Sequence, residues 1–266
     1  MAEAAFDTVL TAVDGGVGTV TLNRPDKLNA LTTEMAGEIG RALAIMAKDE
    51  RVRCIVLAGA GRAFCAGADL SLLQDLHDRK DREAGRRIVD GCRQIYRVIR
   101  DAPQIVICAL NGAAAGGGAN LALGCDLRIA SDAASIGQVF AKLGLHPDWG
   151  GSYFLPRLVG AARAIEIFAG AEMIGAARLL ELGIVNRVAP AAELAEAAKS
   201  WAARIAANPP LAMRLMKQAV YRSETESLDA MLDYELEAQL DCFSTQDFTE
   251  GLAAFKARRA PLFTGR

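Results

Sequence analysis

The sequence predicts an α/β fold with a mainly parallel sheet, followed by a helical C-terminal region. Two observations support this prediction. Strand-like and helix-like segments alternate through most of the chain, whereas only helix-like segments follow Pro209 and Pro210. The 266 residues, 52% of them hydrophobic, suffice for one large domain or a core with an appendage. We therefore expect a core over residues 1–208 and a helical region over residues 209–266.

The first elements are predicted by alternation and by helical periodicity. Residues 7–13 and 17–22 form two strand-like segments around an Asp-Gly-Gly turn. Residues 32–50 predict a helix that a Thr can cap. Its apolar residues recur at helical spacing: Met35, Ile39, Leu43 and Met46. A buried strand over residues 53–59 and a loop of small residues over 59–69 follow.

The middle of the chain repeats this alternation. Residues 81–101 predict a helix that ends before Pro103, and its apolar stripe is Ile88, Cys92, Ile95 and Ile99. Strands are expected over 104–110 and near 126–130, with a glycine-rich segment between them. Residues 72–85 are expected to be a loop that shapes any pocket.

The C-terminal region consists of three helix-like segments, over residues 209–220, 226–243 and 249–259. Their apolar stripes have no sheet to cover. We therefore expect them to pack on a neighbour such as another subunit.

Composition excludes several classes of function. The net charge of −2 and the pI of about 5.8 give no basic field for nucleic acid. No apolar run reaches the roughly 20 residues of a membrane span, and the N-terminus lacks the order of a signal peptide. The six cysteines form no C-x-x-C pair, and two histidines are too few for a histidine-based metal site. We expect reduced thiols, no metal and a cytoplasmic protein.

Glycine-rich loops follow two of the predicted strands. A dinucleotide fingerprint is incomplete at both, because its third glycine is replaced by Phe64 in one loop and Leu121 in the other. Tight packing of a helix on a strand is one explanation. The other is an oxyanion hole, because residues 63–69 and 113–120 can each present backbone N–H groups at a helix start. Such a site suits a carbonyl substrate whose oxygen gains negative charge, as in an enolate.

Six segments together resemble the enoyl-CoA hydratase/isomerase (crotonase) superfamily over essentially the whole chain. They are residues 21–31, 61–70, 111–130, 144–160, 177–188 and 250–266. The resemblance implies a β-β-α spiral core and a C-terminal helical trimerisation region. It also implies a homotrimer or a dimer of trimers, with an acyl-CoA thioester as substrate.

The resemblance also assigns site residues. The oxyanion-hole amides would be those of Ala68 and Gly117. The coenzyme A contacts would come from Arg24, Lys27, Leu28, Ala66, Asp69 and Leu70. Lys256, with Arg258 and Arg259, would contact coenzyme A phosphates on an adjacent subunit, although basic residues near a helix C-terminus are also favourable by themselves.

Two positions depart from the hydratase pattern. Hydratases of this family use two glutamates to activate water, and this chain has Asn120 and Phe140 at those positions. An amide is a poor general base and a phenyl ring carries no exchangeable proton. Hydration by the two-glutamate route is therefore not expected, and we place Phe140 in the substrate site instead.

One carboxylate remains in the expected catalytic region. Asp148 occupies a position where isomerases of the superfamily place a functional aspartate, and the surrounding motif looks most like the ring-epoxide isomerases that act on an epoxidised phenylacetyl-CoA. Phe140, Leu145 and Trp149 can desolvate it and raise its pKa. The alternatives are that Asp148 caps a helix, shapes a turn or pairs with His146. Asn120 would hydrogen-bond the substrate or a water, or cap the glycine-started helix.

The leading hypothesis is an acyl-CoA isomerase in fatty-acid or phenylacetate metabolism. The thioester supplies the acidity, so no metal or redox cofactor is expected, and coenzyme A is part of the substrate. The alternatives are an enoyl-CoA hydratase with altered water activation and a non-catalytic acyl-CoA-binding protein.

Overall fold

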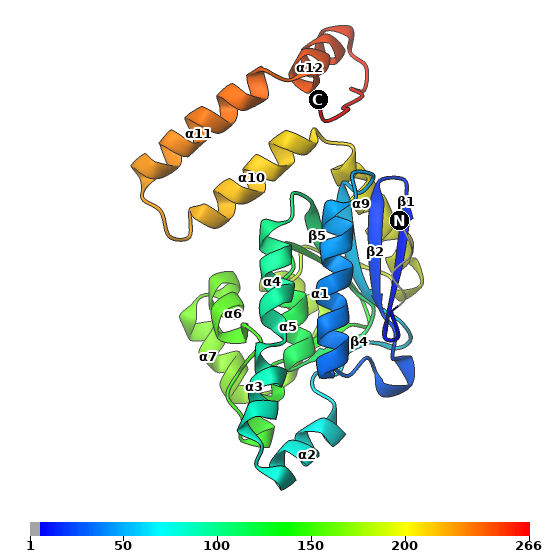
Figure 1. Ribbon diagram of the computed structural model, residues 1–266, viewed down its shortest axis with the longest axis vertical. Coiled ribbons are helices and arrows are strands. Elements are labelled where there is room, and N and C mark those ends of the chain that lie inside the picture. The colour runs from blue at the N-terminus through cyan, green and yellow to red at the C-terminus, as the bar shows by residue number, and fades with distance from the viewer. Residues whose placement is uncertain (1–5) are drawn as a thin grey trace.

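The computed structural model describes residues 6–266. The first five residues of the N-terminal segment, on which the expectation of no signal peptide partly rests, lie outside the described residues. Figure 1 shows a core of sheet and helices, from which α10, α11 and α12 extend at one end. No helix of the described part of the chain is both long and apolar enough to cross a bilayer.

The larger sheet confirms the predicted parallel architecture. Its strand order is β1-β2-β3-β5-β7-β10; β1 and β2 form an antiparallel hairpin, and every other neighbouring pair is parallel. In the register, Val20 of β2 lies opposite Leu57 of β3. The strands are Val9–Asp14, Val17–Leu22, Cys54–Gly59, Ile105–Leu110, Leu127–Ser131 and Arg187–Ala189.

The smaller sheet carries both glycine-rich loops. Its order is β4-β6-β8-β9, with β4, β6 and β8 parallel and β9 antiparallel to β8. The strands are Ala63–Cys65, Ala113–Ala115, Ser135–Gly137 and Met173–Gly175. The expectation of a loop throughout residues 59–69 is wrong at β4, because this buried tripeptide pairs with β6.

Helices cover both faces of the larger sheet, because successive side chains along each strand point to opposite faces and both faces are apolar. Ile55 and Leu57 of β3 pack in the core beneath α1 and α4, whereas Cys54 and Val56 pack beneath α9. Thr32 caps α1 as predicted, since its side chain accepts a hydrogen bond from the Met35 amide. These helices are α1 (Thr33–Lys48), α4 (Cys92–Asp101) and α9 (Leu194–Ala206).

The segment that was expected to be a loop over residues 72–85 is helical instead. It forms α2 (Leu70–Arg79) and the start of α3 (Arg82–Asp90). Each helix has an acidic N-cap: Asp69 accepts from the Ser71 amide, and Asp81 accepts from the Glu83 and Ala84 amides. The single helix predicted over 81–101 is divided at Gly91 into α3 and α4.

The remaining helices connect the sheets and form the C-terminal region. They are α5 (Gly117–Leu123), α6 (Gly151–Val159), α7 (Ala161–Gly170), α8 (Ala176–Glu181), α10 (Pro210–Arg222), α11 (Leu228–Phe243) and α12 (Gln246–Ala257), with short 3₁₀ turns at Pro25–Lys27, Val139–Leu143 and Ala191–Glu193. The prediction that helices alone follow Pro210 is confirmed.

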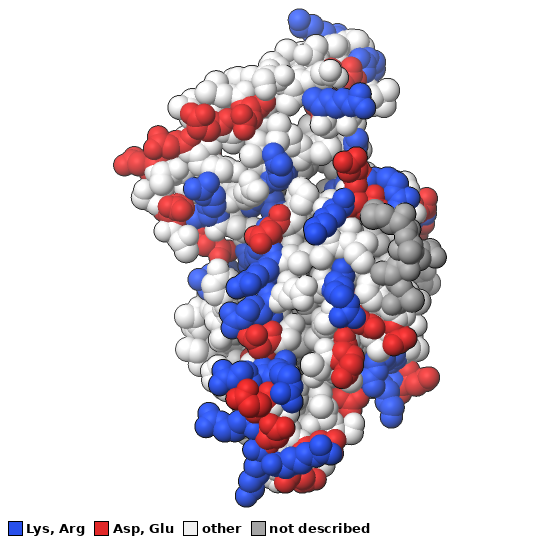
Figure 2. All heavy atoms as spheres, viewed as in Figure 1, with Lys and Arg blue, Asp and Glu red and all other residues white. Residues whose placement is uncertain are grey.

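Helix α10 is fastened to the core by a buried ion pair. The Lys217 ammonium lies 2.7 Å from the Asp126 carboxylate and also donates to the Gln104 carbonyl at 2.8 Å. Helices α11 and α12, which we call the C-terminal arm, extend beyond this anchor (Figure 1). On the face drawn in Figure 2, basic and acidic side chains are interspersed over the core, and acidic side chains follow α11.

Candidate active site

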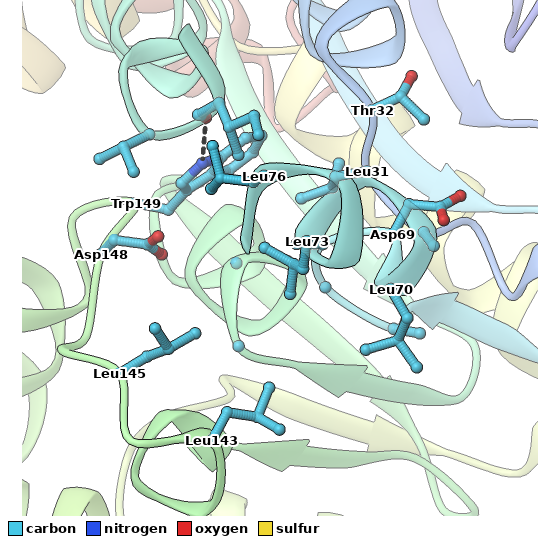
Figure 3. A pocket seen from close by; sticks show the side chains of 18 of the residues that line it. Leu31, Thr32, Asp69, Leu70, Leu73, Leu76, Leu143, Leu145, Asp148 and Trp149 are labelled. Carbon is cyan, nitrogen blue, oxygen red and sulfur yellow. Dashed lines mark hydrogen bonds between the residues drawn. The ribbon is translucent and has the colours of Figure 1, made fainter. Parts of the chain in front are cut away.

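A cavity of about 650 Å³ lies where the two glycine-rich loops meet α2, α3 and the 3₁₀ turn at Val139–Leu143. Its wall is mostly apolar, with leucines contributed by α2 and by the segment before α6 (Figure 3). The predicted residues that line it are Lys27, Leu28, Ala66, Ala68, Asp69, Leu70, Gly117, Phe140 and Asp148. Three predicted residues do not line it: Arg24, Asn120 and Lys256.

The first loop holds the Ala68 amide free. On either side of Ala68, the Gly67 carbonyl accepts from the Leu31 amide at 2.7 Å, and the Asp69 amide donates to the Leu31 carbonyl at 3.0 Å. Gly67 has a φ of +92°, and a Cβ there would lie 2.7 Å from the Ala115 carbonyl oxygen. Glycine therefore lets this loop approach the second one. Among residues 6–266, no acceptor takes the Ala68 N–H.

The second loop presents the Gly117 amide at the start of α5. Gly117 is the first residue of that helix, so its N–H has no acceptor within the helix. A Cβ on Gly118 would lie 2.3 Å from the Cys65 carbonyl oxygen, so this glycine lets α5 pack against β4. Both explanations of the glycine run therefore apply, to different residues: Gly118 serves packing and Gly117 offers an N–H.

Asp148 stands in the segment that joins the 3₁₀ turn at Val139–Leu143 to α6. Figure 3 shows it with Leu145 at one end of the cavity, opposite Asp69 and Leu70. Burial raises its pKa to about 6, although its own backbone amide and the charge of His146 lower it. Phe140, Leu145 and Trp149 line the same cavity, as expected for residues that desolvate this carboxyl.

Two of the alternative roles of Asp148, the helix cap and the His146 pair, do not fit the structure, whereas Asp148 does stand in a turn, since its carbonyl accepts from the Gly151 amide at 2.9 Å. Helix α6 is capped by Gly150, without a side-chain hydrogen bond, so Asp148 does not cap it. His146 is exposed and forms no ion pair with Asp148. Within the described residues, no other side chain or amide hydrogen-bonds the Asp148 carboxylate.

Asn120 is placed differently from the expectation that it would contact the substrate or a water. It is fully buried within α5, outside the cavity, and it does not cap the helix. Its Nδ2 donates to the Asp148 carbonyl at 2.8 Å, and its Oδ1 accepts from the Gln138 side chain at 2.7 Å. Both ends of the amide are thus bound to the protein.

Arg24 contacts the loop that carries Ala68, and its contact with coenzyme A remains a prediction. Its guanidinium lies 3.1 Å from the Asp69 carboxylate and donates to the Ala30 carbonyl. Arg24 therefore braces the loop that carries Ala68. Lys256 lies exposed on α12, and its contact with coenzyme A on an adjacent subunit remains a prediction.

Several residues in and around the cavity are not predicted from the sequence. Leu73 and Leu76 of α2 line the cavity, in part of the chain where a loop is expected, and so does Ile88 of α3, which lies on the apolar stripe of the helix predicted over 81–101. The acidic N-caps at Asp69 and Asp81 are the local signals that could have revealed these helices. Gln138, which orients Asn120, carries no such local signal, because its partner is distant in sequence.

Groups that could hold a metal are not found in the described part of the chain, where no three His, Cys, Asp or Glu side chains converge. All six cysteines, each within residues 6–266, are free thiols. Burial raises the pKa of Cys54 and Cys65 to about 12, which keeps both thiols protonated.

Comparisons with known proteins agree on one family. The family model described as enoyl-CoA hydratase/isomerase matches residues 12–266. A 1,2-epoxyphenylacetyl-CoA isomerase of Escherichia coli is 39% identical over 98% of this chain and 100% of its own. A short-chain-enoyl-CoA hydratase of Clostridium acetobutylicum is 37% identical over 96% of both chains.

Solved structures share the fold. The crystal structure of an enoyl-CoA hydratase from Bacillus anthracis superposes with a TM-score of 0.92 and 35% identity, covering 98% of this chain and 100% of that one. The likeness therefore extends from the two glycine-rich loops through the C-terminal helices. The chain belongs to the enoyl-CoA hydratase/isomerase family.

Proposed function

We propose that this protein is an acyl-CoA isomerase in which Asp148 carries the proton. One observation supports the proposal above all. A carboxylate with a raised pKa, hydrogen-bonded within the described residues only by its own backbone amide, faces an apolar cavity that also receives two free backbone amides, those of Ala68 and Gly117. The other carboxylate of the cavity, Asp69, is engaged by Arg24 and Ser71.

The chemistry for a 3-enoyl thioester follows from these groups. The Asp148 carboxylate takes a proton from C2, and the C–H electron pair moves into an enolate whose oxygen becomes negative. The Ala68 and Gly117 N–H groups stabilise that oxygen. The protonated Asp148 then returns the proton to C4, which leaves the double bond between C2 and C3. The thioester supplies the acidity, so the scheme requires no metal or redox cofactor, and coenzyme A is part of the substrate.

The dimensions and lining of the cavity suit a bulky apolar acyl group. The volume of about 650 Å³ and the surrounding Phe140, Leu73 and Trp149 side chains fit an aromatic ring or a medium-length chain. A ring-epoxide phenylacetyl-CoA is the finer candidate, and the relative named 1,2-epoxyphenylacetyl-CoA isomerase supports it. The coenzyme A portion would leave the cavity past Lys27, Asp69 and Leu70.

Hydration is the second candidate, because a relative named as a hydratase is nearly as similar as the one named as an isomerase. Hydration by the two-glutamate route needs a general acid or base at both of the positions that Asn120 and Phe140 occupy. In this chain Phe140 is apolar and Asn120 lies outside the cavity. This arrangement favours isomerisation over hydration.

Product analysis tests the proposal. The wild-type protein would be incubated with a panel of 2-enoyl-, 3-enoyl- and phenylacetyl-derived coenzyme A thioesters, with Asp148→Asn as the control. A product of unchanged mass with a moved double bond, formed by the wild type and lost in the variant, is expected. A product heavier by one water would show a hydratase. Tight binding of every thioester without turnover would show a binding protein.

A further inference from the structure

The turn that carries Asp148 has an unusual backbone. Trp149 has a φ of +44°, and Gly150 follows with a φ of +73°. A bulky residue in the left-handed region is costly and persists only where the surroundings hold it. Two such contacts hold Trp149: Tyr96 donates its hydroxyl to the Trp149 carbonyl at 2.8 Å, and the indole N–H donates to the Ile88 carbonyl at 3.1 Å.

A further hydrogen bond, donated by Asn120, holds Asp148 itself. The Asp148 carbonyl accepts from the Asn120 Nδ2 at 2.8 Å and from the Gly151 amide at 2.9 Å. A carbonyl can only accept, so the Asn120 amide must turn its NH₂ group to Asp148 and its oxygen to Gln138. Gln138, which is also buried, donates to that oxygen at 2.7 Å. The donor and acceptor directions along the hydrogen-bond chain from Gln138 through Asn120 to the Asp148 carbonyl are therefore fixed.

Asn120 is closely packed against the segment that it holds. Its side chain presses on the start of α6, where a Cβ on Gly151 would lie 2.5 Å from the Asn120 Nδ2. Asn120 is also fully buried. In addition, it belongs to α5, the helix whose first residue is Gly117. One rigid helix thus holds the Asp148 turn by a side chain and offers an oxyanion donor at its N-terminus.

We infer that Asn120 is a positioning residue, oriented by Gln138, which fixes Asp148 relative to the Gly117 amide. The inference rests on the proposed function, because it gives Asn120 a purpose only if Asp148 moves the proton. Asn120 touches neither substrate nor cavity, so its effect on the reaction passes through Asp148. Its loss is expected to lower kcat and to leave substrate binding largely intact.

A double-mutant cycle tests this inference. Turnover of the same thioester is measured for the wild type, Asn120→Ala, Asp148→Asn and the double variant. Gln104→Ala is the matched control, because Gln104 is a buried amide that donates to the Ala47 and Val52 carbonyls, away from the cavity. Gln138→Met removes only the donor that orients Asn120 and serves if Asn120→Ala does not fold.

The expected result is non-additive. Asn120→Ala lowers kcat about 10-fold, less than the 10²-fold that a 1 Å misplacement can cost, with KM changed by less than about threefold. In the Asp148→Asn background the same change lowers kcat no further. Gln104→Ala lowers the melting temperature and leaves kcat unchanged.

The acid limb of kcat/KM gives a second readout. Once released, the Asp148 carboxyl reaches more water, so the limb of Asn120→Ala is expected to move to lower pH. Other titratable groups near Asp148 are His146 of its own segment and Cys92 and Tyr96 of α4. Burial raises the pKa of Cys92 to about 11 and raises the pKa of Tyr96 well above its ordinary value, so neither titrates on the acid side.

Three outcomes would overturn the inference. Equal loss of kcat on removing Asn120 in both backgrounds would show a merely structural role. Unchanged kcat and an unchanged acid limb in Asn120→Ala would show no role. Full activity of Asp148→Asn would overturn the proposed function itself, and the positioning role with it, whereas the first two outcomes leave the proposed function standing.

Discussion

Apolar side chains beside Asp148 and along the C-terminal arm differ in how far they are exposed to solvent. Beside Asp148 two aromatic side chains are shielded, with Trp149 4% and Phe140 7% exposed. Along α11 a stripe at helical spacing is left open, with Leu228 73% and Leu236 57% exposed. The stripe continues through Leu232, Leu240 and Phe243. Burial in the cavity raises the pKa of the Asp148 carboxyl. The exposed apolar stripe on the arm is typical of a surface that contacts a partner.

The change with the largest expected effect removes the proton carrier from the apolar cavity. Asp148→Asn keeps the shape of the side chain but cannot take up a proton, so turnover is expected to fall about 10²–10⁴-fold. Steady-state kinetics on one thioester, with folding checked by melting temperature, measures this. Asn120→Ala should lose much less, because Asn120 acts only through Asp148. Full isomerase activity in Asp148→Asn, with none in Asn120→Ala, would contradict the assignment of the base.

Obstructing the oxyanion hole should have the next largest effect. A Cβ on Gly117 would lie 3.3 Å from the Leu31 side chain and 3.6 Å from the Trp149 ring, so Gly117→Val places a branched side chain in the cavity. We expect turnover to fall roughly 100-fold or more. Gly170→Val is the control, because a Cβ there meets no atom within 4 Å. Near-normal turnover in folded Gly117→Val would exclude the Gly117 amide as the donor.

Substitutions on the C-terminal arm should change the oligomeric state of the protein more than its turnover. If another subunit covers the stripe on α11, the double change Leu232→Glu and Leu236→Glu should yield a smaller species by light scattering, with a smaller loss of turnover than Gly117→Val. Asp233→Lys changes a charge on the same helix and should keep the wild-type mass. An active monomeric wild type would show that the stripe has no partner of its own kind.

A truncation that tests the arm should leave α10 in place. Lys217 of α10 neutralises the buried Asp126, so removing α10 would leave an unpaired charge in the core. A chain ending after Ser223 keeps this ion pair and should fold. A chain ending before Leu211 should aggregate, because it also exposes the apolar surface beneath α10.

The smallest expected effect is on stability. The pKa of Asp148 is raised by folding to about 6, so the folded chain holds this proton to higher pH than the unfolded chain. The resulting stabilisation is present below the ordinary pKa of about 4 and is lost as pH rises through about 6. Asp148→Asn should therefore melt above the wild type at neutral pH, and the difference should shrink toward acid pH. Calorimetric melting temperatures that differ equally at every pH would contradict this.

Local sequence was sufficient for much of the fold and for part of the site. Alternating segments and a Thr cap located α1 and the parallel strands. The two glycine-rich loops indicated backbone N–H donors, and the family resemblance assigned them to Ala68 and Gly117. Asp148 was found because its motif resembles a known one. In each case the signal lies within a few neighbouring residues.

The remaining features of the site depend on contacts between residues that are distant in the sequence. Arg24 and Asn120 are polar residues in the right motifs, but their partners are Asp69 and the Asp148 carbonyl, which lie 45 and 28 positions away. No local pattern shows that a polar group is already bound by a distant one. Leu73 was missed for a different reason, since the charged surroundings of α2 conceal its apolar face.

The pH dependence of kcat/KM for double-bond migration tests the central claim most directly, because it reports the ionisation of the base in the free enzyme. With Asp148 as that base, activity is expected to fall as the pH drops through about 6, since the protonated carboxyl cannot take a proton. The limb should vanish together with the activity in Asp148→Asn. An acid limb near the ordinary carboxyl value of about 4, or a limb that persists in Asp148→Asn, would contradict the account.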